Sequence, residues 1–508
     1  MTIGETIAEL HRSLRDYVEA TYHISHPTLV ELRRALLDQQ AVISQRPYLE
    51  STPRYQSGAS FVNISGLHPS VTQVLAGVTG RLVYDPPYAH QATAMQTVLV
   101  DGRSAVVMTG TGSGKTESFL LPILGKLAIE ARTKPGSFQS RPAVRALILY
   151  PMNALVNDQL GRLRLLFGDK SIAGQFMQWA GRPARFGRYT SRTLYPGVRD
   201  PKKDQQRLKP IGDYYVSHLE QAAQPPSPQQ QRAKDLVDAL RVRGKWPAKP
   251  DLAAWYGAKG TRWFDDKNNV FKRCVVMPGD PELFTRHEVH QAPPDILVTN
   301  YSMLEYMLMR PLERPIFDKT REWLHSDPSN TLLLVVDEAH LYRGAAGAEV
   351  ALLLRRLRKR LEIPAERLQV ICTSASFNVG SYAGQFAAQL TGKQETDFRI
   401  ISGQLQLRPN GGPGTLADAT ILAGIDLAAY HSAERDDQRL AIVKPLLDYR
   451  QATGSTLGVA LYAALEQFPP MSDLINRTMK EALAVESLAG QLFPGIDSNL
   501  AAKAVTVL

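Results

Sequence analysis

Five short apolar runs between residues 104 and 376 contain few polar positions, and they predict the centre of the fold. They read SAVVMT (104–109), RALILY (145–150), DILVTN (295–300), TLLLVVD (331–337) and LQVICTSAS (368–376). Strands in which apolar and polar residues do not alternate are buried on both faces, as in a parallel sheet covered by helices. Segments with helical spacing lie between the runs. The pattern therefore predicts an α/β fold with a parallel sheet over residues 81–400.

Helical patterns flank this region on both sides. LVELRRALLDQQAVI (29–43) carries leucines at helical spacing, and DLINRTMKEALAVESLAGQLF (473–493) is amphipathic. We expect a helical N-terminal segment over 1–80 and a mostly helical segment over 401–508. Residues 191–293 interrupt the alternation of strands and helices with a proline- and glutamine-rich stretch and a basic part that contains tryptophans. This stretch is expected to be an insertion into the α/β region.

The positive charge is concentrated in this insertion. The chain carries a net charge of +10, and residues 181–275 alone hold 20 Lys or Arg against 9 Asp or Glu. Such a stretch favours a polyanion as partner, and aromatic side chains among the charges can stack on bases. The alternative is that these aromatic residues form a small core of the insertion itself, and the sequence leaves both interpretations open. The aromatic residues are Trp246, Trp255, Tyr256 and Trp263, and the expected phosphate contacts are Lys245, Lys249, Lys259 and Arg262.

Composition excludes several other classes of protein. With 508 residues and 44% hydrophobic content the chain can fill at least one large core. It has no apolar run of membrane-spanning length, and its polar N-terminus lacks the apolar centre of a signal peptide, so we expect a cytoplasmic protein without membrane contact. Cys274 and Cys372 are far apart, which argues against a zinc site and a disulfide framework.

A glycine-rich loop follows the first of the predicted strands. VMTGTGSGKTES (107–118) places glycines at every second position before Lys115 and Thr116, and a helical pattern begins directly afterwards. The order of strand, glycine loop and helix is that of a P-loop, in which backbone N–H groups and a helix N-terminus surround phosphates. Lys115 is expected to reach the β- and γ-phosphates of ATP, and Thr116 to bind Mg²⁺. The candidate nucleotide-binding residues here are Thr111, Gly112, Ser113, Gly114, Lys115, Thr116 and Glu117.

An acidic motif follows the fourth predicted strand. LLLVVDEAHLYRG (332–344) places Asp337 at the carboxyl end of a buried strand, where open parallel sheets collect their ligands. We expect Asp337 to bind Mg²⁺ together with Thr116, and Glu338 to position and polarise the attacking water. His340 is expected to couple the nucleotide to groups across the cleft. The candidate catalytic residues are therefore Lys115, Asp337, Glu338 and His340.

With these two motifs, residues 81–400 resemble the DEAD/DEAH-box helicases of superfamily 2, which implies a RecA-like P-loop NTPase lobe. YDPPYAHQ (84–91) resembles the adenine-reading Q motif, so that Gln91 is implied to bind adenine. The remaining motifs follow in the order of the family. They are YPMNALVNDQ (150–159) as motif Ia, GRYTS (187–191) as Ib, TNYSMLEYML (299–308) as Ic and TSAS (373–376) as motif III.

The resemblance also implies roles for residues outside the nucleotide site. In this family motifs Ia, Ib and Ic contact the nucleic-acid backbone, and motif III couples that contact to the nucleotide. The implied nucleic-acid contacts are Pro151, Asn153, Arg188, Thr190, Thr299 and Asn300. The implied coupling residues are Thr373, Ser374 and Ser376.

Within the superfamily the chain resembles the long bacterial helicases of phage-defence systems such as DISARM and Druantia, which favours DNA over RNA as the nucleic-acid partner. Three features depart from the family pattern. Thr109 stands where motif I usually has Ala or Gly, TSAS replaces Ser-Ala-Thr, and the insertion is much longer than in minimal members.

Residues 401–508 contain no arginine-rich motif of a second RecA-like lobe. LAGIDLAAY (422–430) and PGIDSNL (494–500) share a tripeptide with motif V, but no such motif follows either. We therefore expect the second lobe elsewhere in the full-length protein or on a partner chain, and slow ATP hydrolysis by this chain alone. Two functions remain open: the ATP-binding lobe of a helicase, or a nucleotide-gated module that recruits a partner to nucleic acid without turnover.

Overall fold

The computed structural model describes residues 3–39, 41–45, 48–110, 112–258, 260–375 and 382–508. The chain divides into two compact units. The larger unit comprises Tyr55–Gln404, and the smaller unit comprises Met1–Arg54 and Leu405–Leu508. In the described part of the chain, no helix has the length and apolar character needed to span a membrane.

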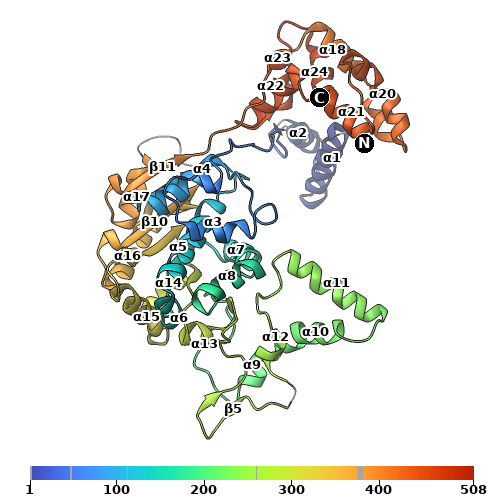
Figure 1. Ribbon diagram of the computed structural model, residues 1–508. Coiled ribbons are helices and arrows are strands. Elements are labelled where there is room, and N and C mark those ends of the chain that lie inside the picture. Colours follow the sequence, from blue (N-terminus) through green and yellow to red (C-terminus); the bar gives the residue numbers. More distant parts are fainter. Residues whose placement is uncertain (1–2, 40, 46–47, 111, 259, 376–381) are drawn as a thin grey trace. The chain divides into compact units, whose positions relative to one another are not determined.

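An eight-stranded parallel sheet forms the centre of the larger unit (Figure 1). The five strands expected from the apolar runs are confirmed, and every pairing within this sheet is parallel. In spatial order the strands are β11 (Phe398–Ser402), β2 (Ser104–Met108), β10 (Leu368–Ser374), β9 (Leu332–Val336), β3 (Ala146–Tyr150), β8 (Ile296–Asn300), β4 (Phe186–Arg188) and β7 (Glu282–Leu283).

Two hydrophobic clusters cover the two faces of the sheet, because successive side chains of a strand point to opposite sides. Ala105 and Val107 of β2 belong to one cluster, and Val106 and Met108 belong to the other. The first cluster contains residues of α3 (Pro69–Ala76), α5 (Glu117–Thr133), α7 (Asn153–Phe167) and α8 (Lys170–Ala180). The second contains residues of α14 (Tyr301–Met309), α15 (Arg314–His325), α16 (Gly344–Leu361) and α17 (Tyr382–Thr391).

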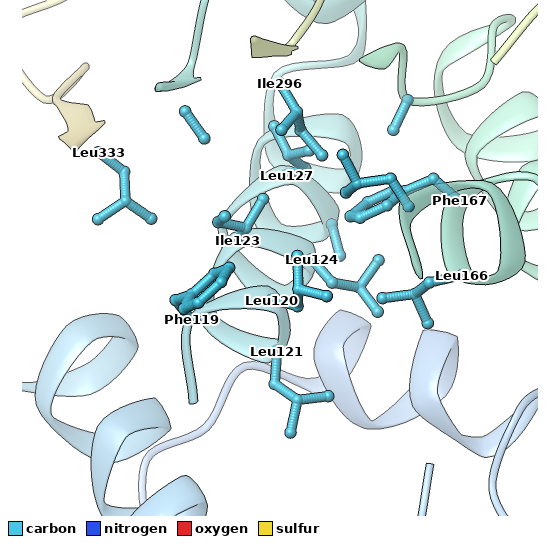
Figure 2. Packing of buried hydrophobic residues seen from close by; sticks show 14 of the residues in the cluster. Phe119, Leu120, Leu121, Ile123, Leu124, Leu127, Leu166, Phe167, Ile296 and Leu333 are labelled. Atoms are coloured by element: carbon cyan, nitrogen blue, oxygen red, sulfur yellow. The ribbon is translucent and has the colours of Figure 1, made fainter. Parts of the chain in front are cut away.

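Helix α5 is buried along most of its length and fixes the glycine-rich loop to the sheet. Figure 2 shows its apolar side chains together with Leu166 and Phe167 of α7 and with Ile296 and Leu333 of the sheet. Phe119, Ile123 and Leu124 are fully buried in this cluster. This packing therefore fixes the start of α5, and with it the end of the glycine-rich loop, against the sheet.

The boundaries of the larger unit differ from those expected. We expected residues 1–80 to form a helical segment of their own, but residues 55–80 belong to the unit that contains the sheet. The reason is that α3 buries Val71, Val74 and Leu75 in the cluster beside α5. At the other end the unit extends to Gln404, because β11 pairs with β2 as an edge strand.

The smaller unit is mainly helical and has its own hydrophobic core. Its helices are α1 (Ile3–Thr21), α2 (Pro27–Leu37), α18 (Leu416–Ala423), α19 (Leu427–Ser432), α20 (Asp436–Tyr449), α21 (Leu457–Leu465), α22 (Pro469–Thr478), α23 (Val485–Leu492) and α24 (Ser498–Val507). A short antiparallel pair joins β1 (Tyr48–Leu49) to β12 (Leu483–Ala484). In α2 the helical spacing is confirmed, but only Leu37 of its leucines is buried and Leu29, Leu32 and Leu36 are exposed.

The insertion folds around a small core within the larger unit. It contains α9 (Asp204–Ile211), α10 (Ser217–Ala222), α11 (Pro228–Val242), α12 (Leu252–Tyr256) and the antiparallel pair β5 (Phe264–Asp265) and β6 (Val270–Phe271) (Figure 1). Trp246 and Trp255 are buried in this core, and Tyr256 and Trp263 pack against it. Of the two interpretations of these aromatic residues, the structure supports the small core.

One expected phosphate contact in the insertion is wrong. The Lys249 side chain is completely buried, and its ammonium group donates to Asp280 at 2.6 Å and to Glu288 at 3.0 Å. A buried charge needs such partners, because desolvation without them costs several kcal/mol. Lys249 therefore stabilises the insertion and cannot face a ligand. Lys259 lies outside the described residues, whereas Lys245 is exposed.

Candidate functional site

The carboxyl ends of the sheet strands carry nearly all of the expected motifs, and the strand order sorts them into two groups. The glycine loop, Thr373 with Ser374, and Asp337 follow or end the adjacent strands β2, β10 and β9. Pro151, Asn300 and Arg188 follow or end the adjacent strands β3, β8 and β4. The motifs that are expected to bind the nucleotide and those that are expected to contact nucleic acid thus lie on neighbouring halves of one edge of the sheet.

The glycine loop has the backbone conformation that a phosphate cradle requires. Gly112 and Gly114 have φ values of 72° and 69°, which residues with a Cβ adopt rarely. A Cβ on Gly114 would lie 2.4 Å from Nε2 of Gln91, so the position is also closely packed. Ser113 is buried and donates to the hydroxyl of Thr109 at 2.6 Å. Thr109, the residue that departs from the family pattern, therefore ties the loop to the end of β2. Thr111 lies outside the described residues.

Lys115 and the acidic motif meet across the site. The ammonium group of Lys115 lies 3.2 Å from Oε1 of Glu338, and both side chains are partly exposed, at 12% and 25%. Glu338 has a left-handed backbone with φ of 50°, and its N–H donates to Oδ1 of Asp337 at 3.0 Å. The hydroxyl of Thr373 also donates to Asp337. His340 lies 3.4 Å from Oε2 of Glu338.

Motif III lies behind the acidic motif, on the neighbouring strand. Nδ1 of His340 and the hydroxyl of Ser374 are 3.2 Å apart, within hydrogen-bonding distance. Thr373 and Ser374 are both fully buried at the end of β10. Their hydroxyl groups therefore connect β10 to both ends of the acidic motif. Ser376, the third implied coupling residue, lies outside the described residues.

The oxygen groups at the site suit a magnesium ion. Burial, reinforced by the charge of Glu338, raises the pKa of Asp337, while the hydrogen bond from Thr373 and the charge of Lys115 act in the opposite direction. The hydroxyl of Thr116 accepts a hydrogen bond from Gln159 at 3.3 Å. Oε2 of Glu338 is buried and accepts no hydrogen bond in the described part of the chain. Mg²⁺ is usually held by one or two protein oxygens together with phosphates and water, and this donor set fits that pattern.

Gln91 of the expected Q motif forms a hydrogen bond with the glycine loop. Nε2 of Gln91 donates to the carbonyl of Gly114 at 3.0 Å, and its Oε1 accepts from the N–H of Tyr88 at 3.0 Å. Both ends of the Gln91 amide are therefore engaged with the chain itself, and adenine binding by this residue stays a prediction. Glu117 begins α5 and accepts a hydrogen bond from Arg162 at 3.1 Å.

Two residues of the site were missed by sequence reasoning. His90 is buried, and its Nε2–H donates to the carbonyl of Ser113 at 3.0 Å. The hydroxyl of Tyr55 accepts from the N–H of Gly110 at 3.1 Å, and its ring lies 5.3 Å from that of His90. The position of His90 next to Gln91 is a usable signal in the sequence. Nothing in the sequence connects Tyr55 to a loop 55 residues away.

The burial of His90 predicts a pH dependence of stability. Burial lowers the pKa of His90 to about 4, whereas an unfolded histidine titrates near 6.5. The unfolded chain therefore binds this proton first as the pH falls, and the stability contribution is full above about pH 6.5 and is lost towards pH 4. Replacing His90→Gln should remove up to about 2 kcal/mol of the stability loss between about pH 7.5 and pH 5. Urea unfolding at both pH values measures the free energy of unfolding. An equal loss of this free energy in the parent and in the variant would show that His90 does not cause the pH dependence.

The half of the edge that carries the implied nucleic-acid contacts contains both accessible and buried residues. Asn153 begins α7 and accepts from the amide of Asn300 at 2.7 Å, while Arg188 donates to Asn157 at 2.5 Å. Pro151, Asn153 and Arg188 are partly exposed. Thr299 is fully buried and donates to the carbonyl of Tyr189 at 2.7 Å.

Thr190 is also buried, with 1% exposure, and its hydroxyl accepts from the N–H of Arg192 at 3.2 Å. Asn300 is 8% exposed, and its Oδ1 caps α14 by accepting from the N–H of Met303. The geometry brings all six implied contacts to one edge. Only Pro151, Asn153 and Arg188 present more than a small part of their surface there.

Comparison with protein families and curated relatives agrees with this geometry. The family model for DEAD/DEAH box helicases matches residues 88–185 and 258–382. This chain contains a DEAD/DEAH box helicase domain. The family model does not match residues 186–257, which include 191–257 of the insertion, whereas residues 258–293 of the insertion lie in the second matched part. The α/β fold with a RecA-like parallel sheet is confirmed.

The whole chain is similar to a longer bacterial protein. It is 42% identical over 534 aligned residues to Druantia protein DruE of Escherichia coli, and the match covers 100% of this chain and 28% of DruE. It is 34% identical over 104 residues to the uncharacterized ATP-dependent helicase MJ1574 of Methanocaldococcus jannaschii, covering 20% of this chain and 14% of that protein. Among solved structures, the DUF1998 helicase MrfA bound to DNA matches with a TM-score of 0.37 and 20% identity, covering 75% of this chain and 34% of that one.

Proposed function

We propose that this chain is the ATP-binding lobe of a nucleic-acid-dependent ATPase that acts on DNA. The observation that carries the proposal is the connected set of polar contacts across three adjacent strands. Lys115 contacts Glu338, the adjacent Asp337 accepts from Thr373, and His340 lies within hydrogen-bonding distance of Ser374. A movement of Lys115 or Glu338 can therefore be transmitted to Thr373 and Ser374 of motif III through direct contacts between side chains.

The proposed roles follow from where each group lies. Lys115 binds the β- and γ-phosphates of ATP, and the N–H groups of the glycine loop surround them. Glu338 orients the attacking water through its carboxylate, whose Oε2 has no other hydrogen-bond donor in the described part of the chain. Mg²⁺, held by Thr116 and Asp337, would supply positive charge between the phosphates. Gln91 would bind adenine by exchanging its present backbone partners.

The nucleic-acid partner is proposed to be DNA, and the biological role phage defence. Both rest on the resemblance to long bacterial phage-defence helicases and on the similarity to Druantia protein DruE. Pro151, Asn153 and Arg188 would contact the backbone, with Asn300 fixing Asn153. Thr190 and Thr299 would act by positioning these residues, because their hydroxyl groups are buried.

The choice between DNA and RNA is tested by binding. Fluorescence anisotropy with single-stranded, duplex and forked DNA, and with RNA of the same sequences, should give tighter binding to DNA over a range of salt concentrations. Arg188→Gln should weaken binding of every such ligand, because the contact is to phosphate and carries no sequence information. Tighter binding to RNA throughout would overturn the DNA assignment.

Hydrolysis is proposed to require a second lobe, in the full-length protein or on a partner chain. The matched chain spans 28% of DruE, which leaves room for such a lobe. An arginine finger is worth about 10³ to 10⁵ in rate, so this chain by itself should bind Mg·ATP and hydrolyse it slowly. Addition of an arginine-rich second lobe should restore DNA-stimulated turnover. If it does not, the alternative of a nucleotide-gated recruiting module is favoured.

A further inference from the structure

A basic groove lies beside Arg188, between the helicase domain and the insertion. It has a volume of about 540 Å³ and is formed by α7, the end of β4, the turn after α11, and side chains of the insertion and of the segment before α13 (Arg286–Gln291). Its lining includes the basic residues Arg188, Arg192, Arg243 and Lys245 and the aromatic residues Tyr215 and Phe284. Of the expected helicase motifs, Ia contributes Asn157 and Asp158 to the groove and Ib contributes Arg188, and no described residue of the other motifs lines it.

The turn that carries two of these cations is fixed tightly to α7. Gly244 has φ of 64°, and a Cβ there would lie 2.3 Å from the carbonyl oxygen of Gly161. Arg164 of α7 binds Glu282 through two hydrogen bonds of 2.9 and 2.7 Å and also donates to the carbonyls of Gly244 and Lys245. The positions of Arg243 and Lys245 are therefore determined by backbone contacts, although their side chains are exposed.

The charges in this groove are not compensated by the protein. None of Arg188, Arg192, Arg243 and Lys245 forms an ion pair within the described residues, whereas the neighbouring Arg164 and Lys249 are both paired with buried carboxylates. The only acidic side chain that lines the groove in the described chain is Asp158. Four unpaired cations around a concave surface attract a polyanion.

The aromatic residues give the groove a second property. The ring of Tyr215 is half-buried and perpendicular to that of Trp246, with ring centres 5.1 Å apart, and it contacts Phe284 in the same way at 6.0 Å. The core of the insertion therefore holds Tyr215 in place at the groove. Bases stack on such rings only when they are unpaired, since a duplex hides their faces.

We propose that this groove binds single-stranded nucleic acid, with Arg192, Arg243 and Lys245 contacting phosphates and Tyr215 stacking on a base. The inference rests on the proposed function and extends it, because the strand held by motif Ib at Arg188 would continue onto the insertion. The insertion thereby lengthens the track that the helicase domain provides. Its tryptophans support this surface from within and do not contact the strand.

The test replaces Arg243 and Lys245 together by Gln in the whole chain. Binding of a fluorescent oligothymidylate is measured by anisotropy over a series of salt concentrations. Loss of two phosphate contacts should lower the slope of log K against log salt by about 1.4, and counterion release alone should weaken binding roughly 25-fold at about 0.1 M salt. Both side chains are exposed, so the thermal unfolding midpoint should not change.

A matched control lies on the same insertion. Arg232 and Lys234 are exposed on α11 outside this groove, so their replacement by Gln removes the same charge and should leave the slope nearly unchanged. The proposed groove would be wrong if the Arg243→Gln/Lys245→Gln variant and the parent had the same slope of log K against log salt. It would also be wrong if the control pair lowered the slope by the same amount. A slope that falls for duplex DNA but not for the single strand would overturn the single-strand assignment.

Failure of the groove can be distinguished from failure of the proposed function. If Arg188→Gln lowers the slope while the Arg243 and Lys245 pair does not, the helicase domain binds nucleic acid and only the groove is wrong. If no variant affects binding because the parent does not bind at all, the proposed function fails. Tyr215→Leu should weaken single-strand binding several-fold without changing the slope, because stacking releases no counterions.

Discussion

Replacing Lys115→Ala is expected to weaken ATP binding by at least about 10²-fold, since hydrogen bonds to charged groups are worth about 1.5–3 kcal/mol each. Lys115 is the cation that the glycine loop directs towards the site, and its ammonium group lies 3.2 Å from Glu338. Removal of the side chain also leaves the Glu338 carboxylate without this positive neighbour, which repels the phosphates further. Equilibrium binding of a fluorescent ATP analogue in the presence of Mg²⁺ measures the effect.

The control for this variant is Lys170→Ala. Lys170 is exposed at the first turn of α8, so the substitution makes the same change of charge outside the site. Lys115 is only partly buried, and the fold of both variants should survive, which thermal unfolding checks. Binding of the analogue by Lys115→Ala as tightly as by the parent would show that the loop does not hold phosphates.

The second expected result is that Glu338→Gln abolishes hydrolysis while ATP still binds. An amide keeps the size of the side chain but cannot accept a proton or polarise water as a carboxylate does, and general-base catalysis contributes about 10²- to 10⁴-fold. Lys115 remains free to bind phosphate. Steady-state hydrolysis with saturating single-stranded DNA, in the protein that includes the second lobe, should therefore fall by about 10² or more.

Glu362→Gln is the control, because it makes the same chemical change at a residue that has the same backbone conformation as Glu338. Glu362 also has a left-handed backbone, with φ of 55°, but it caps α16, is exposed and pairs with Arg321. Its replacement should change hydrolysis very little, because exposed ion pairs contribute at most about 1 kcal/mol to stability. Retained turnover in Glu338→Gln would assign the activation of water to another group.

The central strands of the α/β region, and the positions of the glycine loop and Asp337 at the ends of these strands, could be predicted from the sequence because they depend on short stretches of chain. Fully buried strands show as apolar runs without alternation, and a strand followed by glycines, Lys115 and a helix predicts a phosphate-binding loop. For the same reason, the position of Asp337 at the end of its strand could be predicted. The boundary at residue 80 was wrong, because the leucine and valines of α3 give the same pattern whichever core they join.

The roles of the charged and aromatic residues of the insertion could not be predicted in this way. Lys245 and Lys249 are four positions apart and equally basic in the sequence, yet one is exposed and the other is buried between two carboxylates. The partners of Lys249 are 31 and 39 positions away along the chain. Only the folded chain decides which cation is neutralised and which remains available for a ligand.

The sequence by itself determined the five adjacent strands β2, β10, β9, β3 and β8 and the polar residues that end them, because burial and turn chemistry act over a few neighbouring residues, whereas β11, β4 and β7 show no such apolar run. Only the tertiary structure decided the order of those strands. Motifs I, III and II are separate segments of the sequence, but they follow or end the adjacent strands β2, β10 and β9. In the same way, motifs Ia, Ic and Ib follow or end the adjacent strands β3, β8 and β4. Strand order depends on pairings across the whole unit, and the paired residues of the eight-stranded sheet are from 36 positions apart (Leu332 and Leu368) to 294 positions apart (Ser104 and Phe398).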